Sequence, residues 1–227
     1  MIIATGNEHK VQEIRAILGP AFQCLCLKDF RDAPSVVEDA ETFVGNAVKK
    51  AVELAKWLAQ RRSELAEASR LGGDSFVLSD DSGLEVDVLN GAPGVHSARF
   101  AALDTGQKTN SSAAENNAKL LRLLEKVPRE SRSARFKCVL ALTPVLQVEP
   151  TDSSPVCFAD EFEVHTRTFA GVCEGWIGFG LRGQGGFGYD PLFFPEGYDR
   201  TFGELSEAVK NQLSHRAKAL GLLKRAL

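Results

Sequence analysis

Two adjacent carboxylates, Asp80 and Asp81, follow the short apolar run 76–78 and precede Ser82 and a glycine. Carboxylates this close repel each other, so they require a cation or a shared proton. Hard oxygen ligands of this kind suit Mg²⁺, which joins one or two protein carboxylates to substrate phosphates. The plainer alternative is a solvated Asp-Ser-Gly turn, and the acids alone do not separate these two interpretations.

A third acid, Glu38, precedes a helix that the sequence predicts to begin near Thr42, and Lys50 lies on that helix. A glutamate at this place commonly complements the helix dipole. It could also be a further oxygen ligand for a metal at Asp81, and Lys50 could reach a phosphate. The structural interpretation of both residues is favoured until another argument joins them to the acids.

The second candidate is a glycine turn between an apolar first strand and a helix. It comprises Thr5, Gly6, Asn7, Glu8, His9 and Lys10. Free backbone N–H groups at a helix N-terminus attract phosphate, and Lys10 would add a positive charge. The spacing is not that of a Walker A loop, and the alternative is an ordinary helix capped by Asn7.

The third candidate is the glycine-rich segment 185–191, which surrounds two aromatic residues. Glycines around Phe187 and Tyr189 make a poor strand but a good platform on which a flat base could stack. Asp190 could accept hydrogen bonds from the N–H edge of a purine. The alternative is a hairpin turn whose aromatic side chains only pack.

Basic side chains gather near the C-terminus, at Lys210, His215 and Arg216. Ser214 either lies one helical turn after Lys210 or caps the final helix, which we expect from about Gln212 onwards. In both arrangements the three basic side chains could donate to an anion or to a base carbonyl. For this segment alone, a solvated amphipathic helix is the favoured alternative.

Composition limits the class of protein. The chain has 227 residues, which fits one α/β domain or two small ones, and its net charge of −3, 44% hydrophobic and 25% charged residues are ordinary for a globular protein. The charge gives no reason to expect nucleic-acid binding, so phosphate must be held by a local basic cluster. The five cysteines form no Cys-x-x-Cys pair and indicate reduced thiols. The apolar start is too short for a signal peptide or a membrane span, so we expect a cytoplasmic protein without a membrane partner.

Hydrophobic periodicity predicts strands mixed with helices. The expected strands are residues 1–4, 22–27, 76–79, 84–89, 134–142, 156–164 and 166–173. The expected helices begin at Asn7, near Thr42, at Ser111 or Ser112, and near Gln212. This order favours an α/β fold with a mixed sheet in a single domain, residues 1–227.

Together, these segments resemble the motifs of the inosine/xanthosine triphosphate pyrophosphatase family. The matching segments are Ala4-Thr5-Gly6-Asn7, Ser79-Asp80-Asp81-Ser82-Gly83-Leu84, Gly91-Ala92-Pro93-Gly94, Gly186-Phe187-Gly188-Tyr189-Asp190-Pro191 and Ser214-His215-Arg216-Ala217. The resemblance implies an elongated mixed β-sheet flanked by helices, with two lobes around a central substrate cleft, usually in a homodimer. It also implies Mg²⁺-dependent hydrolysis of the deaminated purine nucleotides ITP, dITP and XTP to a monophosphate and pyrophosphate, which cleanses the nucleotide pool.

The resemblance assigns roles to the matching positions. Asp81 matches the acid that serves as general base or metal ligand, Glu38 matches a second metal-binding acid, and Asp80 is a further candidate ligand beside them. The phosphate-binding positions are Thr5, Asn7, Lys10 and Lys50, with Gly6, Glu8 and His9 of the same turn as further substrate-binding candidates. Ser82 matches a substrate contact. The positions for the base and nucleoside are Phe187, Gly188, Tyr189, Asp190, Lys210, His215 and Arg216.

The chain departs from the family pattern at Gly45, where members often carry glutamate. Two other functions remain open at this point: a broader pyrophosphatase of modified nucleotides, and a nucleotide-binding module without turnover. Donors such as His215 and Arg216 would favour the C6 carbonyl of hypoxanthine and xanthine over the amino group of adenine. Guanine shares that carbonyl, so its rejection requires another feature.

Overall fold

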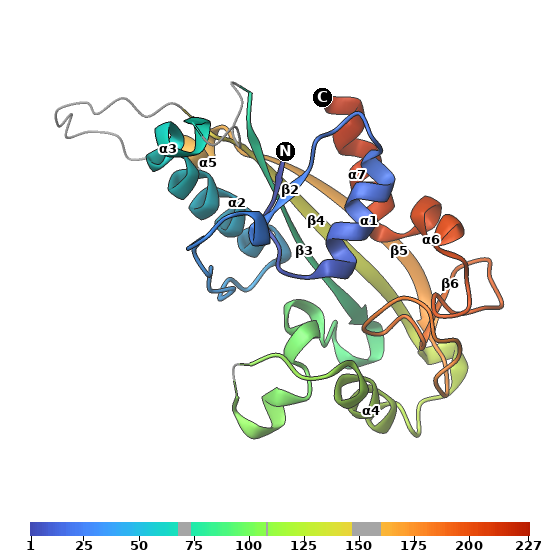
Figure 1. Cartoon of the computed structure of the whole chain (residues 1–227). Helices are drawn as coiled ribbons and strands as arrows, with labels where there is room; N and C mark the ends of the chain where they lie inside the picture. The colour runs from blue at the N-terminus through green and yellow to red at the C-terminus, as the bar shows by residue number, and fades with distance from the viewer. Residues whose placement is uncertain (68–73, 108, 147–159) are drawn as a thin grey trace. The chain divides into compact units, whose positions relative to one another are not determined.

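The computed structural model describes residues 1–67, 74–107, 109–146 and 160–227. Its sheet has the strand order β2-β1-β3-β4-β5-β6. The strands are β1 (Ile2–Ile3), β2 (Leu25–Cys26), β3 (Phe76–Val86), β4 (Ser133–Pro144), β5 (Arg167–Ile177) and β6 (Phe193–Pro195). The α-helices are α1 (Glu8–Leu18), α2 (Phe43–Gln60), α3 (Arg62–Glu67), α4 (Ala113–Leu123), α5 (Glu161–Val164), α6 (Glu207–Leu213) and α7 (His215–Ala226) (Figure 1).

The sheet contains both parallel and antiparallel pairs. β1 runs parallel to β2 and to β3, and Ile2 lies opposite Leu25 on one side and Val77 on the other. β5 and β6 are antiparallel, with Trp176 opposite Phe194. The predicted α/β fold with a mixed sheet is therefore confirmed.

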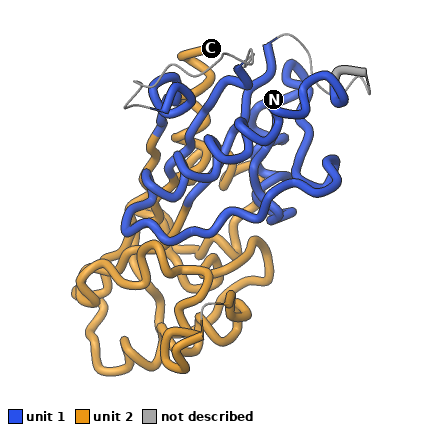
Figure 2. Tube along the Cα trace, turned by 90° about the vertical axis from the view of Figure 1, so that its left-hand side faces the viewer, with its two compact units in different colours: residues 1–81, 139–169 blue, residues 82–138, 170–227 orange. Residues whose placement is uncertain are grey.

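The chain divides into two compact units, coloured separately in Figure 2. Unit 1 comprises residues 1–81 and 139–169, and unit 2 comprises residues 82–138 and 170–227. The boundary in β3 falls between Asp81 and Ser82. The paired acids and their lysines therefore belong to unit 1, whereas the glycine-rich segment and the C-terminal basic residues belong to unit 2.

Unit 1 is built around strands that are buried on both faces. Ile2, Ile3, Val77 and Leu78 are almost completely buried, as continuous apolar strands in a covered sheet should be. Helix α2 buries one face that includes Leu54, and its apolar residues recur at helical spacing. The helix is held in place at its start, because the hydroxyl of the N-cap residue, Thr42, accepts from the backbone N–H of Gly45 at 3.0 Å.

Unit 2 has an aromatic core. The ring of Phe136 meets that of Phe193 edge-on, with centroids 4.7 Å apart, and stacks on that of Phe202 at 6.0 Å. Leu84 and Val86, from the second half of β3, belong to the same buried cluster. This core fixes the strand ends and the loops that carry the candidate base-binding residues.

The prediction of a turn at Asp80 and Asp81 is wrong. We expected two strands, 76–79 and 84–89, around an acidic turn, but β3 is continuous from Phe76 to Val86 and is followed by a short 3-10 helix, Asp87–Leu89. The two acids are buried inside the strand because lysine side chains compensate their charge. Compensation of this kind cannot be inferred from local propensity.

Three other expected elements also differ. The strand expected at 22–27 contains only Leu25–Cys26, and a 3-10 helix follows it. Of the strand expected at 156–164, residues 156–159 lie outside the described residues and the rest forms helix α5, capped by Asp160. The final helix is two helices, because Ser214 is extended (ψ 158°) and its hydroxyl accepts from the N–H of Ala217. Ser214 is therefore a cap, one of the two arrangements that the sequence left open.

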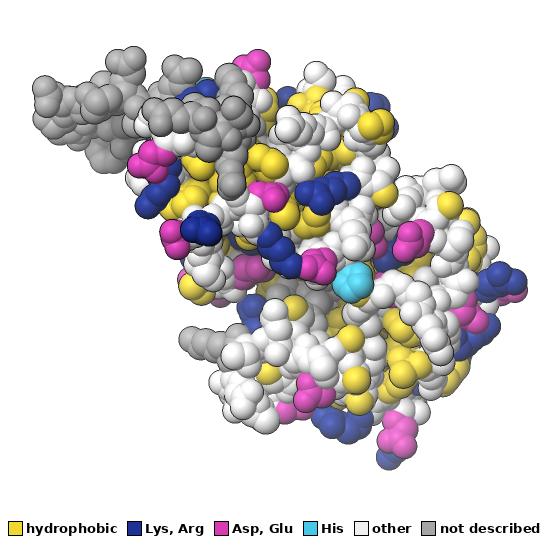
Figure 3. Space-filling model, viewed as in Figure 1, with side chains coloured by type: hydrophobic (Ala, Val, Ile, Leu, Met, Phe, Trp, Pro, Cys, Tyr) yellow, Lys and Arg dark blue, Asp and Glu magenta, His cyan; other side chains and the backbone are white. Residues whose placement is uncertain are grey.

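The surface carries mixed charge. On the face in Figure 3, basic and acidic side chains lie among one another and do not gather by sign. None of the helices in the described part of the chain combines the length and the apolar character needed to span a membrane.

Candidate active site

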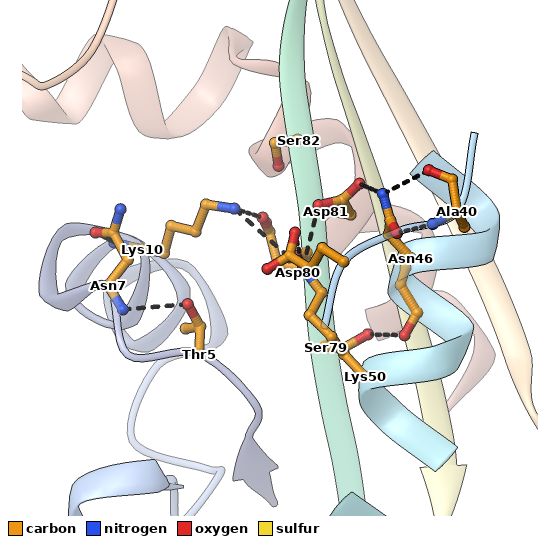
Figure 4. Close-up of polar contacts among 12 residues, drawn as sticks. Thr5, Asn7, Lys10, Ala40, Asn46, Lys50, Ser79, Asp80, Asp81 and Ser82 are labelled. Atoms are coloured by element: carbon orange, nitrogen blue, oxygen red, sulfur yellow. Dashed lines mark hydrogen bonds and ion pairs between the residues drawn. The ribbon is translucent and has the colours of Figure 1, made fainter. Parts of the chain in front are cut away.

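Asp80 and Asp81 point to opposite faces of β3, as neighbouring residues of a strand must. Figure 4 shows Asp80 facing Lys10 and Asp81 facing helix α2. Both carboxylates are buried, with 1% and 6% of their residue surface exposed. The two acids therefore do not form one chelating pair, and each has a separate set of partners.

Asp80 is paired with Lys10. The Lys10 ammonium lies 2.5 Å from the Asp80 carboxylate. Lys10 is placed by the first turn of α1, which Asn7 caps by accepting from the backbone N–H of Lys10 at 3.2 Å. The hydroxyl of Thr5 in turn accepts from the N–H of Asn7 at 3.2 Å. The predicted cap is confirmed, and the turn holds a lysine at a helix N-terminus beside a buried acid.

The other residues of the glycine turn point elsewhere. Glu8 and His9 are exposed, and Glu8 forms an ion pair with Lys28. Gly6 has open space where a Cβ would stand, so a ligand could approach its backbone closely. Lys10 is therefore the residue of this turn that the structure joins to the acids of β3, through its ion pair with Asp80.

Asp81 is the centre of a second group of charges. One carboxylate oxygen lies 3.1 Å from the ammonium of Lys50, and the other accepts from the side-chain amide of Asn46 at 3.3 Å. Lys50 also lies 3.2 Å from Glu38. Glu38 and Asp81 share a side-chain hydrogen bond. Sequence motifs 43 residues apart are thus joined around one buried lysine.

The electrostatics make Asp81 the more easily protonated acid of the Glu38–Asp81 pair. Burial raises the pKa of Asp81 to about 6, and the hydrogen bond to Glu38 adds to this increase against the opposing effect of Lys50. Burial also acts to raise the pKa of Glu38, but the Lys50 ammonium and the hydrogen bond from Asp81 outweigh it and hold that pKa below its ordinary value. Of the two acids, Asp81 is therefore the one that takes up a proton first as the pH falls.

Asn46 and Gly45 explain how α2 is aligned with this group. The Asn46 side chain accepts from the N–H of Ala40 at 2.9 Å while it donates to Asp81. A Cβ added to Gly45 would lie 2.8 Å from the Cβ of Ala40, so the turn before α2 packs directly against the glycine. Glutamate at this position would displace Ala40. Sequence reasoning gave Asn46 no role, although it lies beside Gly45 in the motif.

The donor set of this group is suited to a hard divalent cation. Across the described ranges, no cluster of three or more His, Cys, Asp or Glu side chains forms a complete metal site. Glu38 and Asp81, however, supply two carboxylates within hydrogen-bonding reach of each other. Two carboxylates, completed by substrate phosphate oxygens and water, are a common protein environment for Mg²⁺.

In unit 2 the glycine-rich segment forms a loop that is fixed by Asp190. One carboxylate oxygen of Asp190 accepts from the backbone N–H of Phe187 and from the ammonium of Lys210, both at 2.7 Å. Asp190 and Lys210 are both buried. We predicted that Asp190 accepts hydrogen bonds from a base; the structure shows that this oxygen orders the loop.

Phe187 lies among cations. The Lys210 ammonium is 4.9 Å and the Arg216 guanidinium 5.8 Å from the centre of its ring. Arg216 also donates to the hydroxyl of Ser82 at 3.2 Å. The structure thereby links four predicted residues: Lys210 and Arg216 lie beside the half-buried ring of Phe187, and Ser82 contacts Arg216.

Tyr189 and His215 make contacts that support this loop and helix α7. The Tyr189 hydroxyl donates to the backbone carbonyl of Ser97 at 2.9 Å, and burial raises the pKa of that hydroxyl. The imidazole of His215 stacks on Phe136, with centroids 4.8 Å apart and an interplanar angle of 13°. Both side chains are buried, so these contacts anchor the motifs to the core of unit 2.

Gly186 tests how tightly this loop is packed. Its φ is +73°, and an added Cβ would lie 2.1 Å from a carboxylate oxygen of Asp190. We expect Gly186→Ala to lower the free energy of unfolding by about 1–2 kcal/mol through the left-handed backbone alone, with a further loss from displacing Asp190. Thermal unfolding gives the comparison.

Gly197→Ala is the matched control for this change. Its φ is +80°, but nothing lies within 4 Å of the added Cβ, so it reports the backbone penalty alone. We expect Gly186→Ala to lower the melting temperature more than Gly197→Ala does. Equal decreases would contradict the close packing of Asp190 beneath the loop.

Comparisons with known proteins agree over almost the whole chain. The model of the Ham1 family matches residues 1–226. A protein of Desulforamulus reducens named dITP/XTP pyrophosphatase is 44% identical over 97% of this chain and 91% of its own length. One of Geobacter sulfurreducens with the same name is 43% identical over 99% and 94%. The solved structure of a HAM1 protein from Coxiella burnetii has 33% identity, covers 99% of this chain and 96% of that one, and gives a TM-score of 0.74.

Proposed function

This chain belongs to the Ham1 family, and we propose that it hydrolyses XTP, ITP and dITP to the nucleoside monophosphate and pyrophosphate. The observation that carries the proposal is the Glu38–Asp81 carboxylate pair around buried Lys50. A protein that only binds nucleotide gains nothing from acids beside a triphosphate, because they repel its negative charge. A hydrolase needs them to bind a cation and to accept a proton from water.

The residues of unit 1 are suited to the triphosphate. Lys10 and Lys50 supply positive charge, and the start of α1 presents backbone N–H groups beside Lys10. Mg²⁺ held by Glu38 and Asp81 would neutralise phosphate charge and make a bound water more acidic. Asp81, once deprotonated, can orient a water for in-line attack on the α-phosphorus and accept its proton. Asp80 keeps Lys10 extended toward the same strand.

The residues of unit 2 are suited to the base. Phe187 offers a ring on which a purine can stack, and Lys210 and Arg216 are donors beside that ring. Donors at this position favour the C6 carbonyl of hypoxanthine and xanthine. They would face the amino group of adenine with another donor, an unpaired contact that costs about 1–3 kcal/mol.

Release of pyrophosphate from XTP, dITP, GTP and ATP, with and without Mg²⁺, tests the proposal. We expect Mg²⁺-dependent release from XTP and dITP and much slower release from ATP. Equal kcat/KM for all four would favour a pyrophosphatase of broader specificity, which stacking on Phe187 allows. Binding without release would indicate a nucleotide-binding module and would overturn the proposal.

The raised pKa of Asp81 predicts that metal affinity depends on pH. Below pH 6 Asp81 carries its proton, which a metal must displace, so apparent affinity should fall about tenfold for each further pH unit. Above pH 6 it should be constant. Electron paramagnetic resonance of free Mn²⁺ measures this without nucleotide, whose phosphates also titrate. An affinity that does not change between pH 5 and pH 7 would contradict the raised pKa of Asp81.

Two expectations from the sequence stay predictions. They are the homodimer that the resemblance implies and the cytoplasmic location. Neither affects the roles assigned to the two groups of residues.

A further inference from the structure

Side-chain hydrogen bonds hold the loop 186–190, and none of them was predicted from the sequence. Tyr189 is fixed to Ser97, and Asp190 is fixed to Phe187 and Lys210. The third attachment is at the backbone carbonyl of Gly188, which accepts from the side-chain amide of Asn117 at 2.9 Å. Asn117 lies on helix α4, outside every motif that the resemblance uses.

The orientation of the Asn117 amide is fixed by chemistry. A carbonyl only accepts hydrogen bonds, so the Asn117 nitrogen must face Gly188 and the amide oxygen must point away. That oxygen is buried and has no hydrogen-bond partner among the residues that the structure describes. A buried acceptor without a partner costs free energy, and leucine would occupy a similar volume without this cost. The contribution of Asn117 therefore lies in its donor end, at Gly188.

The direction of the Gly188 carbonyl is set by its hydrogen bond to the Asn117 side chain on α4. This carbonyl belongs to the residue that follows Phe187, the ring on which we propose that the base stacks. An accessible carbonyl there would attract an amino group, and guanine and adenine carry an exocyclic amino group, whereas hypoxanthine and xanthine carry none. The hydrogen bond from Asn117 holds this carbonyl toward α4, so the carbonyl is not turned toward such an amino group.

We propose that Asn117 is a positioning residue for base specificity: by engaging the Gly188 carbonyl, it removes an acceptor that would otherwise favour guanine. The proposal rests on the proposed function and deepens it. Lys210 and Arg216 cannot discriminate against guanine through the C6 carbonyl, since guanine shares that group. Asn117 discriminates at the amino group instead, without contacting the base.

The experiment is a comparison of kcat/KM for XTP, ITP and GTP in wild type and Asn117→Leu. Leucine keeps the volume and removes the donor. We expect kcat/KM for GTP relative to XTP to rise about threefold to tenfold, the worth of one hydrogen bond. A purely structural role would lower kcat/KM for all three substrates in the same proportion. If Asn117→Leu does not fold, as judged by circular dichroism, Asn117→Ser supplies the same ratio.

Asn116→Leu is the matched control. Asn116 is also buried on α4, where it accepts from the N–H of Ala101 and donates to the carbonyl of Ala98. The substitution removes these two hydrogen bonds and leaves the bond from Asn117 to Gly188 in place. We expect this variant to lose stability while its GTP/XTP ratio stays at the wild-type value. The inference would be overturned if the GTP/XTP ratio of kcat/KM rose equally in both variants. It would also be overturned if that ratio did not rise in the folded Asn117 variant.

The inference and the proposed function fail in different ways. Wild-type protein that hydrolyses XTP and ITP, with a GTP/XTP ratio unchanged by the Asn117 substitution, overturns the role of Asn117 alone. Wild-type protein that releases pyrophosphate from none of the three nucleotides overturns the proposed function, and the inference with it.

Discussion

Asp81→Asn is expected to lower kcat for XTP hydrolysis by about 10²–10⁴-fold, the usual contribution of a positioned general base. The amide cannot accept a proton from water and is a poorer ligand for a hard cation. The fold should persist, because asparagine has the size of aspartate and its oxygen can still accept from Asn46 or Lys50. Glu38 also remains beside Lys50, so that buried lysine keeps an acidic partner.

Single-turnover pyrophosphate release measures this effect, and chemical denaturation checks the fold. Asp39→Asn is the control, because Asp39 is an exposed acid close to Glu38 in the chain and pairs with Lys49 at 2.7 Å. Its kcat should stay near the wild-type value. Turnover by Asp81→Asn at more than about a tenth of the wild-type rate would rule out a general-base role.

Of the substitutions proposed for this protein, Lys210→Met is expected to lower the free energy of unfolding most. It leaves the buried carboxylate of Asp190 without the Lys210 ammonium 2.7 Å away. Removing one partner of a buried ion pair typically lowers the free energy of unfolding by about 3–5 kcal/mol. Because Asp190 also holds the N–H of Phe187, we expect the loop to loosen and KM for XTP to rise in the same variant. Urea unfolding gives the free energy.

A double variant separates the buried charge from the lost packing. Asp190→Asn combined with Lys210→Met removes both charges, so it should recover part of the stability lost in Lys210→Met alone. Lys49→Met is the control, because it breaks an exposed ion pair with Asp39 and should leave the unfolding free energy nearly unchanged. A loss below about 1 kcal/mol in Lys210→Met would show that the pair behaves as a surface pair.

Sequence patterns predicted the elements that depend on local interactions. The cap at Asn7 is confirmed, and Ser112 is the cap of the two serines that the sequence left open, because an N-cap side chain bonds to backbone only a few residues away. The helix expected from near Thr42 begins there as well. The buried face of α2 follows from apolar spacing, and the mixed sheet follows from the order of strands and helices. Misassigned elements, such as 161–164, are short segments where propensity is weak.

The pairing of Asp80 and Asp81 with lysines could not be predicted from the residues next to them in the sequence. Asp80 and Asp81 resembled a turn because burying two carboxylates in a strand is unfavourable without partners. The partners, Lys10 and Lys50, are 70 and 31 residues away in the chain. Only the tertiary structure decides that β3 passes between the start of α1 and helix α2, so that each acid meets its own lysine (Figure 4).

The sequence by itself therefore determined which chemical groups this protein has: the acids, the lysines, the glycine-rich aromatic loop and the C-terminal donors. It did so because residue types and the order of the motifs can be read directly from the sequence, without knowledge of the fold. The tertiary structure decided how those groups are used: the raised pKa of Asp81 beside Glu38, the pairing of Asp190 with Lys210, and the contact of Asn117 with Gly188. These depend on burial and on contacts between distant segments, which set pKa values and hydrogen-bond partners and have no signature in local sequence.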